Sequence, residues 1–431
     1  MQDRLISMAD AARDAARRMQ DLPGTVKDAA LERIAVALED GAAGIEEANA
    51  LDLARAEADA LPAPIMKRLR FDRPRILQTV AGIRDLARLP DPAGRTLLSR
   101  RLDAGLELYR VACPIGVIGI IFESRPDALV QISTLCLKSG NAVLLKGGSE
   151  AASTNRALAD LIAAACAEAG IPDGWIGLME SREDVSRLLG MDDRVDLLIP
   201  RGSNAFVRHI MDNTRIPVLG HAEGVCHTYI DAQADAGMAV RVCLDAKAQY
   251  VAVCNATETV LIHRAAATEA LPALADAFRS AGVEMFGDAD VRAMTGCAPA
   301  GDWHTEYLDY KVSIRLVDSL DEAIDHINRY GSGHTDAIIT RDADAAARFL
   351  SRVDSGNVFW NCSTRFSDGF RYGFGAEVGV STSKIHARGP VGLEGLMTYK
   401  YKLIGNGDIV ADFASGARSF RHEDLDRPCP L

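Results

Sequence analysis

Apolar residues recur at spacings of three and four positions along the first ninety residues, and the period of the pattern changes after them. Residues 8–19, 26–58 and 76–89 are rich in alanine and carry one apolar face, which is typical of amphipathic helices. Pro90 and Pro92 follow the last of these stretches, and proline does not continue a helix. We therefore expect the first part of the chain to be helical.

A different pattern begins at residue 96. Residues 96–101 and 106–112 are two strand-like runs joined by Asp103-Ala104-Gly105, a sequence that is typical of a hairpin. From Pro114 onwards, short apolar runs alternate with helical stretches. Strands are expected at residues 116–122, 142–145, 175–179, 195–199 and 226–230, and helices at residues 128–138, 150–169 and 205–212. This alternation indicates a parallel sheet that is covered on both faces.

A second alternating set begins near Ala234. Its expected strands are residues 259–263, 312–317, 335–340 and 357–360, and its expected helices are residues 265–281, 320–329 and 343–353. Residues 361–395 then contain seven glycines and little periodicity, and a loop of this length in a compact domain is usually functional. Residues 396–404 predict one more strand. The pattern as a whole predicts an α/β protein with two lobes.

Composition narrows the class of partner. The 431 residues are 48% hydrophobic and 25% charged, and the net charge of −12 argues against nucleic acid and against an anionic membrane as partners. No run approaches the ~18 apolar residues of a membrane span, and the N-terminus has no signal-peptide core, so the cytoplasm is the expected location. The nine cysteines include no CxxC pair and no histidine spacing suited to zinc, so we expect neither a disulfide framework nor a metal site.

One cysteine is a candidate nucleophile. Cys254 stands in a short polar segment just before the apolar run 259–263. A thiol at the lip of a strand can face a cleft, where a positive dipole or a nearby cation makes it reactive. The alternative is a small buried side chain, which is the common state of a free cysteine. Cys226-His227 looks like a Cys–His pair, but neighbours on a strand point to opposite faces, which favours a structural role.

Two segments have the form of a nucleotide-binding turn. Residues 144–150 and 197–203 each run from a strand end through glycine to a helix start, where backbone N–H groups face a phosphate. Ser203 suits the N-cap of the second helix. Ordinary capped turns have the same form, so both readings stay open on these segments alone. Neither alternating set carries a G-x-G-x-x-G turn or a Walker loop after its first strand.

Segments of particular content and order extend over nearly the whole chain. They are residues 114–127 (PIGVIGIIFESRPD), 137–142 (LKSGNA), 145–148 (LKGG), 199–203 (IPRGS), 224–227 (GVCH), 302–309 (DWHTEYLD), 328–336 (NRYGSGHTD), 363–369 (STRFSDG), 375–379 (GAEVG) and 389–395 (GPVGLEG). Together with the Cys254 segment they resemble the aldehyde dehydrogenase superfamily and, within it, the γ-glutamyl phosphate reductase family. The later segments are particular to that family, whereas the tail after Phe413 is weakly diagnostic.

The resemblance implies roles for particular residues. Cys254 falls on the catalytic thiol of the superfamily. Lys146 falls on the lysine that binds the adenosine ribose, and Glu306 on the glutamate that grips the nicotinamide ribose. Gly202 and Ser203 fall on the turn that meets the pyrophosphate of the cofactor.

The same comparison points to NADPH rather than NADH. In members of the superfamily that use NAD, a glutamate three residues after the ribose lysine holds the 2′-hydroxyl. Ser149 stands at that place here, and Glu150 is one step further on. Without the carboxylate, repulsion against a 2′-phosphate is removed, and serine can donate a hydrogen bond to it.

Substrate-binding residues are expected in two places. The loop with Ser363, Thr364 and Arg365 falls on the segment that anchors the α-carboxylate of the substrate. Arg125 has a similar claim, because arginine suits both carboxylate and phosphate; the alternative is a loop residue that leads into the next helix.

The chain departs from the superfamily pattern in two places. Ser124 occupies the position of the asparagine that donates to the oxyanion, so the backbone N–H of Cys254 is expected to carry more of that role. The segment 218–223 has no glutamate at the place of the residue that activates water, and Glu223 lies a few positions beyond it. Without that base the thioester is protected from hydrolysis, as a reductase requires.

The resulting prediction is an aldehyde-dehydrogenase-like α/β fold with two Rossmann-like αβα lobes and a β-flap for oligomerisation. Residues 1–231 are expected to bind the cofactor and 232–389 to form the catalytic domain. The flap combines the hairpin 96–112 with a strand from 390–431. The implied reaction is NADPH-dependent reduction of L-glutamyl 5-phosphate to L-glutamate 5-semialdehyde, the second step of proline synthesis, through a thioester on Cys254.

Other properties stay open at this point. The resemblance implies a homo-oligomer, and glutamate 5-kinase is a candidate partner because it would supply the labile acyl phosphate. The nearest rival function is a hydrolytic aldehyde dehydrogenase, which needs the missing base. The rival from another class is an inactive homologue that serves as a binding protein, and the joint presence of Cys254, Lys146 and Glu306 argues against it.

Overall fold

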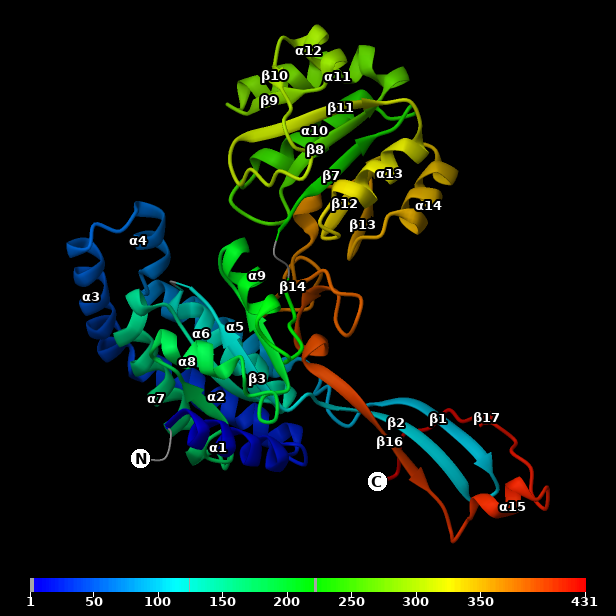
Figure 1. Cartoon of the computed structure of the whole chain (residues 1–431). Coiled ribbons are helices and arrows are strands. Elements are labelled where there is room, and N and C mark those ends of the chain that lie inside the picture. Colours follow the sequence, from blue (N-terminus) through cyan, green and yellow to red (C-terminus); the bar gives the residue numbers. More distant parts are fainter. Residues whose placement is uncertain (1–3, 124, 221–222) are drawn as a thin grey trace.

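The computed structural model describes residues 4–123, 125–220 and 223–431. For residues 63 and 64 it describes the backbone alone. Figure 1 shows two α/β lobes and an arm of long strands that extends away from both. None of the helices in this described part is long and apolar enough to cross a membrane.

The predicted helical start of the chain is confirmed. Its helices are α1 (Arg4–Met19), α2 (Gly24–Asp40), α3 (Ala42–Ala58), α4 (Ala63–Leu69) and α5 (Arg73–Arg88). The continuous pattern over 26–58 is broken at Gly41, and a Cβ there would lie 2.7 Å from Leu161 Cδ1. The space for a side chain is therefore narrow where the chain passes close to α7, and a new helix begins after Gly41.

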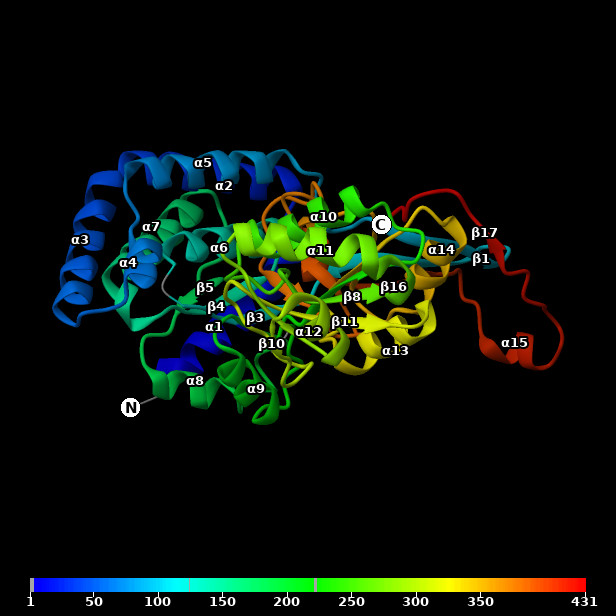
Figure 2. The same ribbon diagram turned by 90° about the horizontal axis from the view of Figure 1, so that it is seen from above.

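The first lobe is built on a four-stranded parallel sheet of order β5-β4-β3-β6. Its strands are β3 (Val117–Ile121), β4 (Ala142–Lys146), β5 (Ile176–Leu178) and β6 (Leu197–Pro200). Its helices are α6 (Pro126–Ser139), η1 (Ser149–Ala151), α7 (Ala152–Glu168), α8 (Arg182–Leu188) and α9 (Asn204–Asp212). Figure 2 shows α1 and α8 on one side of this sheet and α6 and α7 on the other. The strand order reverses between β3 and β6, and ligands of open α/β sheets bind at the carboxyl ends of such a pair.

The second lobe has a seven-stranded parallel sheet of order β10-β9-β11-β8-β7-β12-β13. Its strands are β7 (Cys226–Ile230), β8 (Thr257–His263), β9 (Glu284–Gly287), β10 (Ala298–Pro299), β11 (Lys311–Val317), β12 (Thr335–Ile339) and β13 (Asn357–Trp360). Its helices are α10 (Ala236–Ala248), α11 (Arg264–Ser280), α12 (Ala289–Thr295), α13 (Leu320–Tyr330) and α14 (Ala343–Arg352). The predicted boundary at residue 231 assigns β7 to the first lobe, whereas this strand pairs with β8 and β12 in the second sheet.

The arm is a separate antiparallel sheet of order β16-β2-β1-β17, which we call the flap. Its strands are β1 (Thr96–Asp103), β2 (Leu106–Pro114), β16 (Met397–Ile404) and β17 (Glu423–Asp424), with the short helix α15 (Val410–Ala414) near its end. The predicted hairpin and late strand are thus confirmed as neighbours. In the glycine-rich loop before the flap lie η2 (Thr364–Phe366), β14 (Gly379–Ser381), β15 (Gly389–Val391) and η3 (Leu393–Leu396).

Candidate active site

Cys254 lies in a turn directly before β8, and the residue is half-buried. It lines a cavity of about 260 Å³ to which both lobes contribute. The first lobe supplies Arg201 and Gly202, which follow β6, and the second supplies Glu306. The carboxyl edge of the first sheet therefore meets the loop that carries the thiol.

The turn that carries the thiol is held through its next residue, Asn255. The Asn255 carbonyl accepts a hydrogen bond from Thr364 Oγ1 at 2.7 Å, and its side-chain amide donates to Ser367 O at 2.8 Å. Arg365 donates to the remaining oxygen, Asn255 Oδ1. All the side-chain and carbonyl groups of Asn255 are thus engaged by the 364–367 loop, which fixes the position of Cys254.

The fold therefore brings the predicted substrate residues to the catalytic turn: Ser363, Thr364 and Arg365. Their side chains are buried and make hydrogen bonds within the protein. The Ser363 hydroxyl accepts from Arg365 N at 3.3 Å, and the Arg365 side chain also donates to Gln249 Oε1 at 3.0 Å. Burial, together with the nearby Arg371, lowers the pKa of Arg365, while Cys254 opposes that shift. These contacts support the thiol, and binding of the substrate by these residues stays a prediction.

A second support comes from the segment before β7. Cys226 Sγ donates to Cys254 O at 3.1 Å, and burial raises the pKa of the Cys226 thiol well above its ordinary value. Gly224 packs directly on the Cys254 backbone, because a Cβ at residue 224 would lie 2.2 Å from Cys254 O. The neighbouring His227 is fully buried, with Nδ1 3.1 Å from Asp336 Oδ1. The predicted structural role of this Cys–His pair agrees with these contacts.

Glu306 is held in the same cavity by both lobes. Its carboxylate accepts from Asn204 Nδ2 at 2.6 Å and from Gly224 N at 2.9 Å. Asn204 begins α9 in the first lobe, so Glu306 links that helix to the segment that packs on Cys254. A glutamate in this place can bind the hydroxyl groups of a ribose.

A buried ion pair stabilises the loop that carries Glu306. Lys247 Nζ lies 2.6 Å from Glu258 Oε2, and both side chains are fully buried. Burial raises the pKa of Glu258 to about 7 and lowers the pKa of Lys247, and their mutual attraction opposes both shifts. Glu258 Oε1 also accepts from Leu308 N at 3.3 Å, and Leu308 has a left-handed backbone with φ of 50°. The pair thus ties β8 to an unusual turn two residues after Glu306.

Replacement of Glu258 by alanine is expected to lower the free energy of unfolding by about 3–5 kcal/mol, because Lys247 would remain buried without its partner. Urea-induced unfolding measures this difference. The double variant Lys247→Met with Glu258→Leu is the control and should be clearly more stable than the single variant. If the single and double variants lose equal stability, the loss comes from packing and the ion pair is not its cause.

The predicted cofactor lysine lies at the end of β4, on the same edge of the sheet. Lys146 is buried and donates to Gly147 O. Burial lowers the pKa of Lys146; Glu150 opposes the shift and Arg182 adds to it. Ser149 follows as the exposed first residue of η1, and Glu150 folds back so that a Cβ at Gly148 would lie 2.0 Å from Glu150 Oε1. The turn is therefore compact, with the carboxylates of Glu150 and Asp184 and the guanidinium of Arg182 near the lysine.

The second predicted phosphate turn lies beside the cavity. Ser203 is the N-cap residue of α9, and its hydroxyl makes no capping hydrogen bond. Gly202 lines the cavity with Cys254, and both Gly202 and Ser203 are exposed. An available hydroxyl at the start of a helix suits a phosphate group.

The remaining sequence predictions concern the oxyanion and the general base. Ser124 lies outside the described residues. Glu223 is paired with Arg208 at 3.2 Å. Glu377, in contrast, lines the cavity with Cys254, and its Oε2 accepts from Gly369 N at 2.8 Å. Within the described part of the chain, no group of three or more His, Cys, Asp or Glu side chains is arranged to hold a metal ion.

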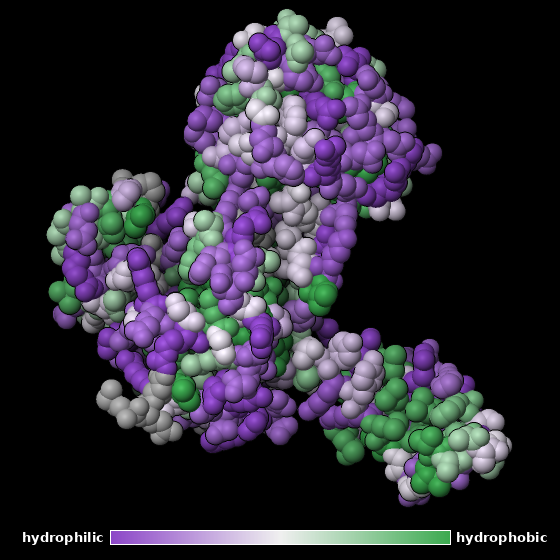
Figure 3. Space-filling view, in the orientation of Figure 1, coloured by the Kyte–Doolittle hydropathy of each residue, from purple (hydrophilic) through white to green (hydrophobic). Residues whose placement is uncertain are grey.

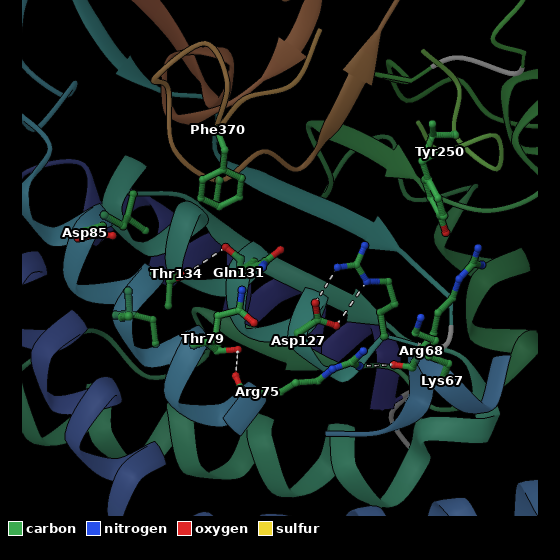
Figure 4. A pocket seen from close by; sticks show the side chains of 18 of the residues that line it. Lys67, Arg68, Arg75, Thr79, Asp85, Asp127, Gln131, Thr134, Tyr250 and Phe370 are labelled. Carbon is green, nitrogen blue, oxygen red and sulfur yellow. Dashed lines mark hydrogen bonds and ion pairs between the residues drawn. The ribbon is translucent and has the colours of Figure 1, made fainter. Parts of the chain in front are cut away.

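A larger cavity of about 1000 Å³ adjoins the first one, and the two share Ala252 and Val253. Arg125 lines it and forms an ion pair with Asp127 at 2.7 Å. Figure 4 shows Tyr250 and Phe370 on one side of this cavity and Lys67, Arg68 and Arg75 on the other. These last three cations were not predicted as site residues, since they lie between the helical stretches 26–58 and 76–89 and belong to no motif.

Comparisons with known proteins agree with this geometry. The pattern of the aldehyde dehydrogenase family matches residues 2–296 and 312–401. The γ-glutamyl phosphate reductase of Acetivibrio thermocellus is 60% identical over 98% of this chain and 99% of its own length. That of Natronomonas pharaonis is 52% identical over 97% of both chains.

Solved structures give the same result. The crystal structure of γ-glutamyl phosphate reductase from Thermotoga maritima has a TM-score of 0.92 at 37% identity, over 94% of this chain and 100% of that one. An acetylating aldehyde dehydrogenase from Geobacillus thermoglucosidasius shares the fold at 15% identity, with a TM-score of 0.63 over 95% of this chain and 99% of that one.

Proposed function

The chain belongs to the aldehyde dehydrogenase family, within its γ-glutamyl phosphate reductases, and we propose that Cys254 carries the reaction as a thioester with NADPH as the hydride donor. The reaction is the reduction of L-glutamyl 5-phosphate to L-glutamate 5-semialdehyde in proline biosynthesis. The observation that carries the proposal is a single cavity that contains Cys254, Glu306 and the start of α9.

In this mechanism the Cys254 thiolate attacks the acyl carbon of the substrate. The bond from that carbon to the phosphate oxygen breaks, phosphate leaves with the electron pair, and a thioester remains. A nicotinamide cofactor held by Glu306 and the start of α9 would supply the hydride that reduces this thioester. The thiohemiacetal on Cys254 then collapses to the semialdehyde and returns the thiolate.

The described residues assist by placement and by electrostatics. The 364–367 loop and Gly224 fix the Cys254 backbone. The Cys254 N–H has no acceptor among the described residues, so it is available to the oxyanion that forms on the acyl oxygen. Glu306, fixed by Asn204 and Gly224, orients the nicotinamide ribose.

The donor set of the first lobe fits a nicotinamide dinucleotide. The Ser203 hydroxyl and the start of α9 suit the pyrophosphate, and Lys146 lies where an adenosine ribose would reach the end of β4. The buried Asn155 Oδ1 has no hydrogen-bond partner among the described residues, and the Asn155 side chain reaches from α7 to Gly147 in this turn. An unsatisfied acceptor beside this turn agrees with a site for a hydroxyl-bearing ligand.

NADPH is expected to be preferred over NADH. Ser149 offers a hydroxyl at the start of η1, and Arg182 adds positive potential near Lys146. Catalytic efficiencies are measured in the reverse direction, with semialdehyde, phosphate and either NADP⁺ or NAD⁺. Arg182→Gln should reduce the efficiency with NADP⁺ and leave that with NAD⁺ nearly unchanged.

The competing influence on this preference is Glu150, whose carboxylate lies at the same turn. A wild-type preference for NAD⁺ that disappears in Glu150→Gln would show that this carboxylate holds the ribose hydroxyl. That result would contradict the proposed cofactor and leave the reaction itself unaffected.

We also propose that the flap is where copies of this chain associate in the cytoplasm. Large exposed aromatic and aliphatic side chains gather there, and Figure 3 shows hydrophobic residues on the surface of the arm. They include Tyr399, Tyr401, Leu403, Ile409, Val410 and Phe420. A contiguous exposed apolar surface of this kind marks an interaction site.

An acyl phosphate is labile, so an enzyme of the glutamate 5-kinase class is the expected source of the substrate.

A further inference from the structure

Arg201 is a cation beside the candidate nucleophile that none of the roles described above uses. It follows β6 directly, and its backbone N–H donates to Ile121 O at the end of β3 at 2.7 Å. The residue therefore sits where the strand order reverses. It lines the cavity that contains Cys254.

The guanidinium of Arg201 has no partner in the part of the chain that the structure describes. Among the described residues, no hydrogen bond or ion pair satisfies it, whereas Arg125 is paired with Asp127 and Arg208 with Glu223. Burial, followed by the nearby Arg125, lowers the pKa of Arg201; Glu377, Cys254 and Asp127 oppose the shift. Arginine stays charged even so, and a partly desolvated cation without a partner is unfavourable unless an anion occupies the site.

We propose that Arg201 binds the phosphate of the acyl phosphate substrate as it leaves, and inorganic phosphate in the reverse direction, with Arg125 as the second cation. This inference rests on the proposed function. When Cys254 Sγ bonds to the acyl carbon, the carbon–oxygen bond to phosphate breaks and the electron pair moves onto the departing phosphate. The N–H groups of Arg201 stabilise that growing charge, since arginine matches phosphate with two parallel hydrogen bonds.

The larger cavity provides a path for such an anion. Arg125 lines that cavity, Arg201 lines the smaller one, and the two cavities meet at Ala252 and Val253, just before Cys254. The wall of the larger cavity also contains Lys67, Arg68 and Arg75, against the carboxylates of Asp85 and Asp127. These cations give an acidic chain of net charge −12 a local basic surface that attracts a polyanionic substrate.

The cofactor would place a second phosphate group near Arg201, because Gly202 and Ser203 are expected to bind the pyrophosphate of the cofactor. The test must therefore separate substrate phosphate from cofactor phosphate. Oxidation of the semialdehyde allows this separation. Hydride transfer to NADP⁺ occurs before phosphate attacks the thioester, so a first burst of NADPH reports one half-reaction and phosphate-dependent turnover reports the other.

Arg201→Gln is expected to raise the KM for phosphate about tenfold to a hundredfold, as expected for loss of a charged hydrogen-bonding group. The burst amplitude and the KM for NADP⁺ should stay close to the wild-type values. Arg201→Lys keeps the charge and should give an intermediate KM for phosphate. Arg208→Gln removes a charge from the neighbouring helix and should change none of these values.

Three results would overturn the assignment. An increased KM for NADP⁺ with an unchanged KM for phosphate would assign Arg201 to the cofactor. If Arg201→Lys lost the burst while its circular dichroism spectrum stayed unchanged, Arg201 would instead act on the Cys254 thiol or on hydride transfer. Unchanged kinetics in both variants would leave it without a role. Wild-type turnover that needs no phosphate would instead contradict the proposed function itself.

Discussion

Replacement of Cys254 by alanine is expected to lower turnover by at least about three orders of magnitude, because both half-reactions pass through the thioester on this residue. Among the described residues that line the cavity, Cys254 is the one cysteine, so no second thiol there can replace it. Binding of NADPH should persist in the variant, as its expected contacts lie on the first lobe and on Glu306. Initial rates and quenching of protein fluorescence by NADPH measure the two properties.

Cys362→Ala is the matched control for this experiment. Cys362 is also half-buried and precedes the loop that holds Asn255, but burial raises the pKa of its thiol, which makes the thiolate rarer. Its variant should stay within a few-fold of wild type. An inactive but folded Cys362→Ala enzyme, or an active Cys254→Ala enzyme, would show that the nucleophile is not Cys254.

The second large effect is expected from Gly224→Ala. A Cβ at this residue would lie 2.2 Å from Cys254 O and 2.5 Å from Cys254 Cα, so the backbone of the catalytic turn has to move. The Gly224 N–H also donates to Glu306, and that hydrogen bond would shift with it. Displacement of a reacting group by about 1 Å can cost about a hundredfold in rate, and we expect kcat to fall by about that factor.

Gly44→Ala is the control, since a Cβ at Gly44 meets nothing within 4 Å. Residue 44 is exposed on α3, where alanine favours the helix by about 1 kcal/mol over glycine. This variant should keep full activity and equal or higher stability. If Gly224→Ala retains nearly wild-type kcat, the close packing on Cys254 does not set the geometry of the thiol.

The fold was largely predictable because its signals are local. Apolar runs such as 142–145 and 335–340 are strands that the structure confirms as β4 and β12, since a parallel sheet buries both faces of each strand. Short elements such as α8 and β9 escaped, because a few residues carry too little periodicity. β17 escaped for another reason: it forms only by pairing with β1, more than three hundred residues earlier in the chain.

The residues of the candidate site were also predictable only where the sequence carries a local signal. Cys254, Glu306 and Gly202 stand in recognisable segments, and the structure brings them to one cavity. Asn255 and Glu258 were missed, because their importance lies in contacts with residues such as Ser367 and Lys247 that are distant in sequence. Arg201 stands within the segment 199–203, but only the folded chain shows that it lines the cavity with Cys254 and that its guanidinium has no partner among the described residues.

The rival hydrolytic function needs a carboxylate that activates water, and the candidates are Glu223, which is paired with Arg208, and Glu377. Glu377 lines the cavity with Cys254, although its Oε2 is engaged by Gly369 N at 2.8 Å. If this group activated water, the thioester would be hydrolysed without phosphate. The fate of the acyl-enzyme therefore decides between the two functions.

The most direct test of the account is a stopped-flow measurement of NADPH formation from semialdehyde and NADP⁺, with and without phosphate. The account predicts a burst of one NADPH per active site and then arrest when phosphate is absent, because the thioester on Cys254 waits for phosphate. Addition of phosphate should then restore steady turnover. Sustained NADPH formation in phosphate-free buffer, at a rate near that with phosphate, would contradict the reductase mechanism and establish the hydrolytic one.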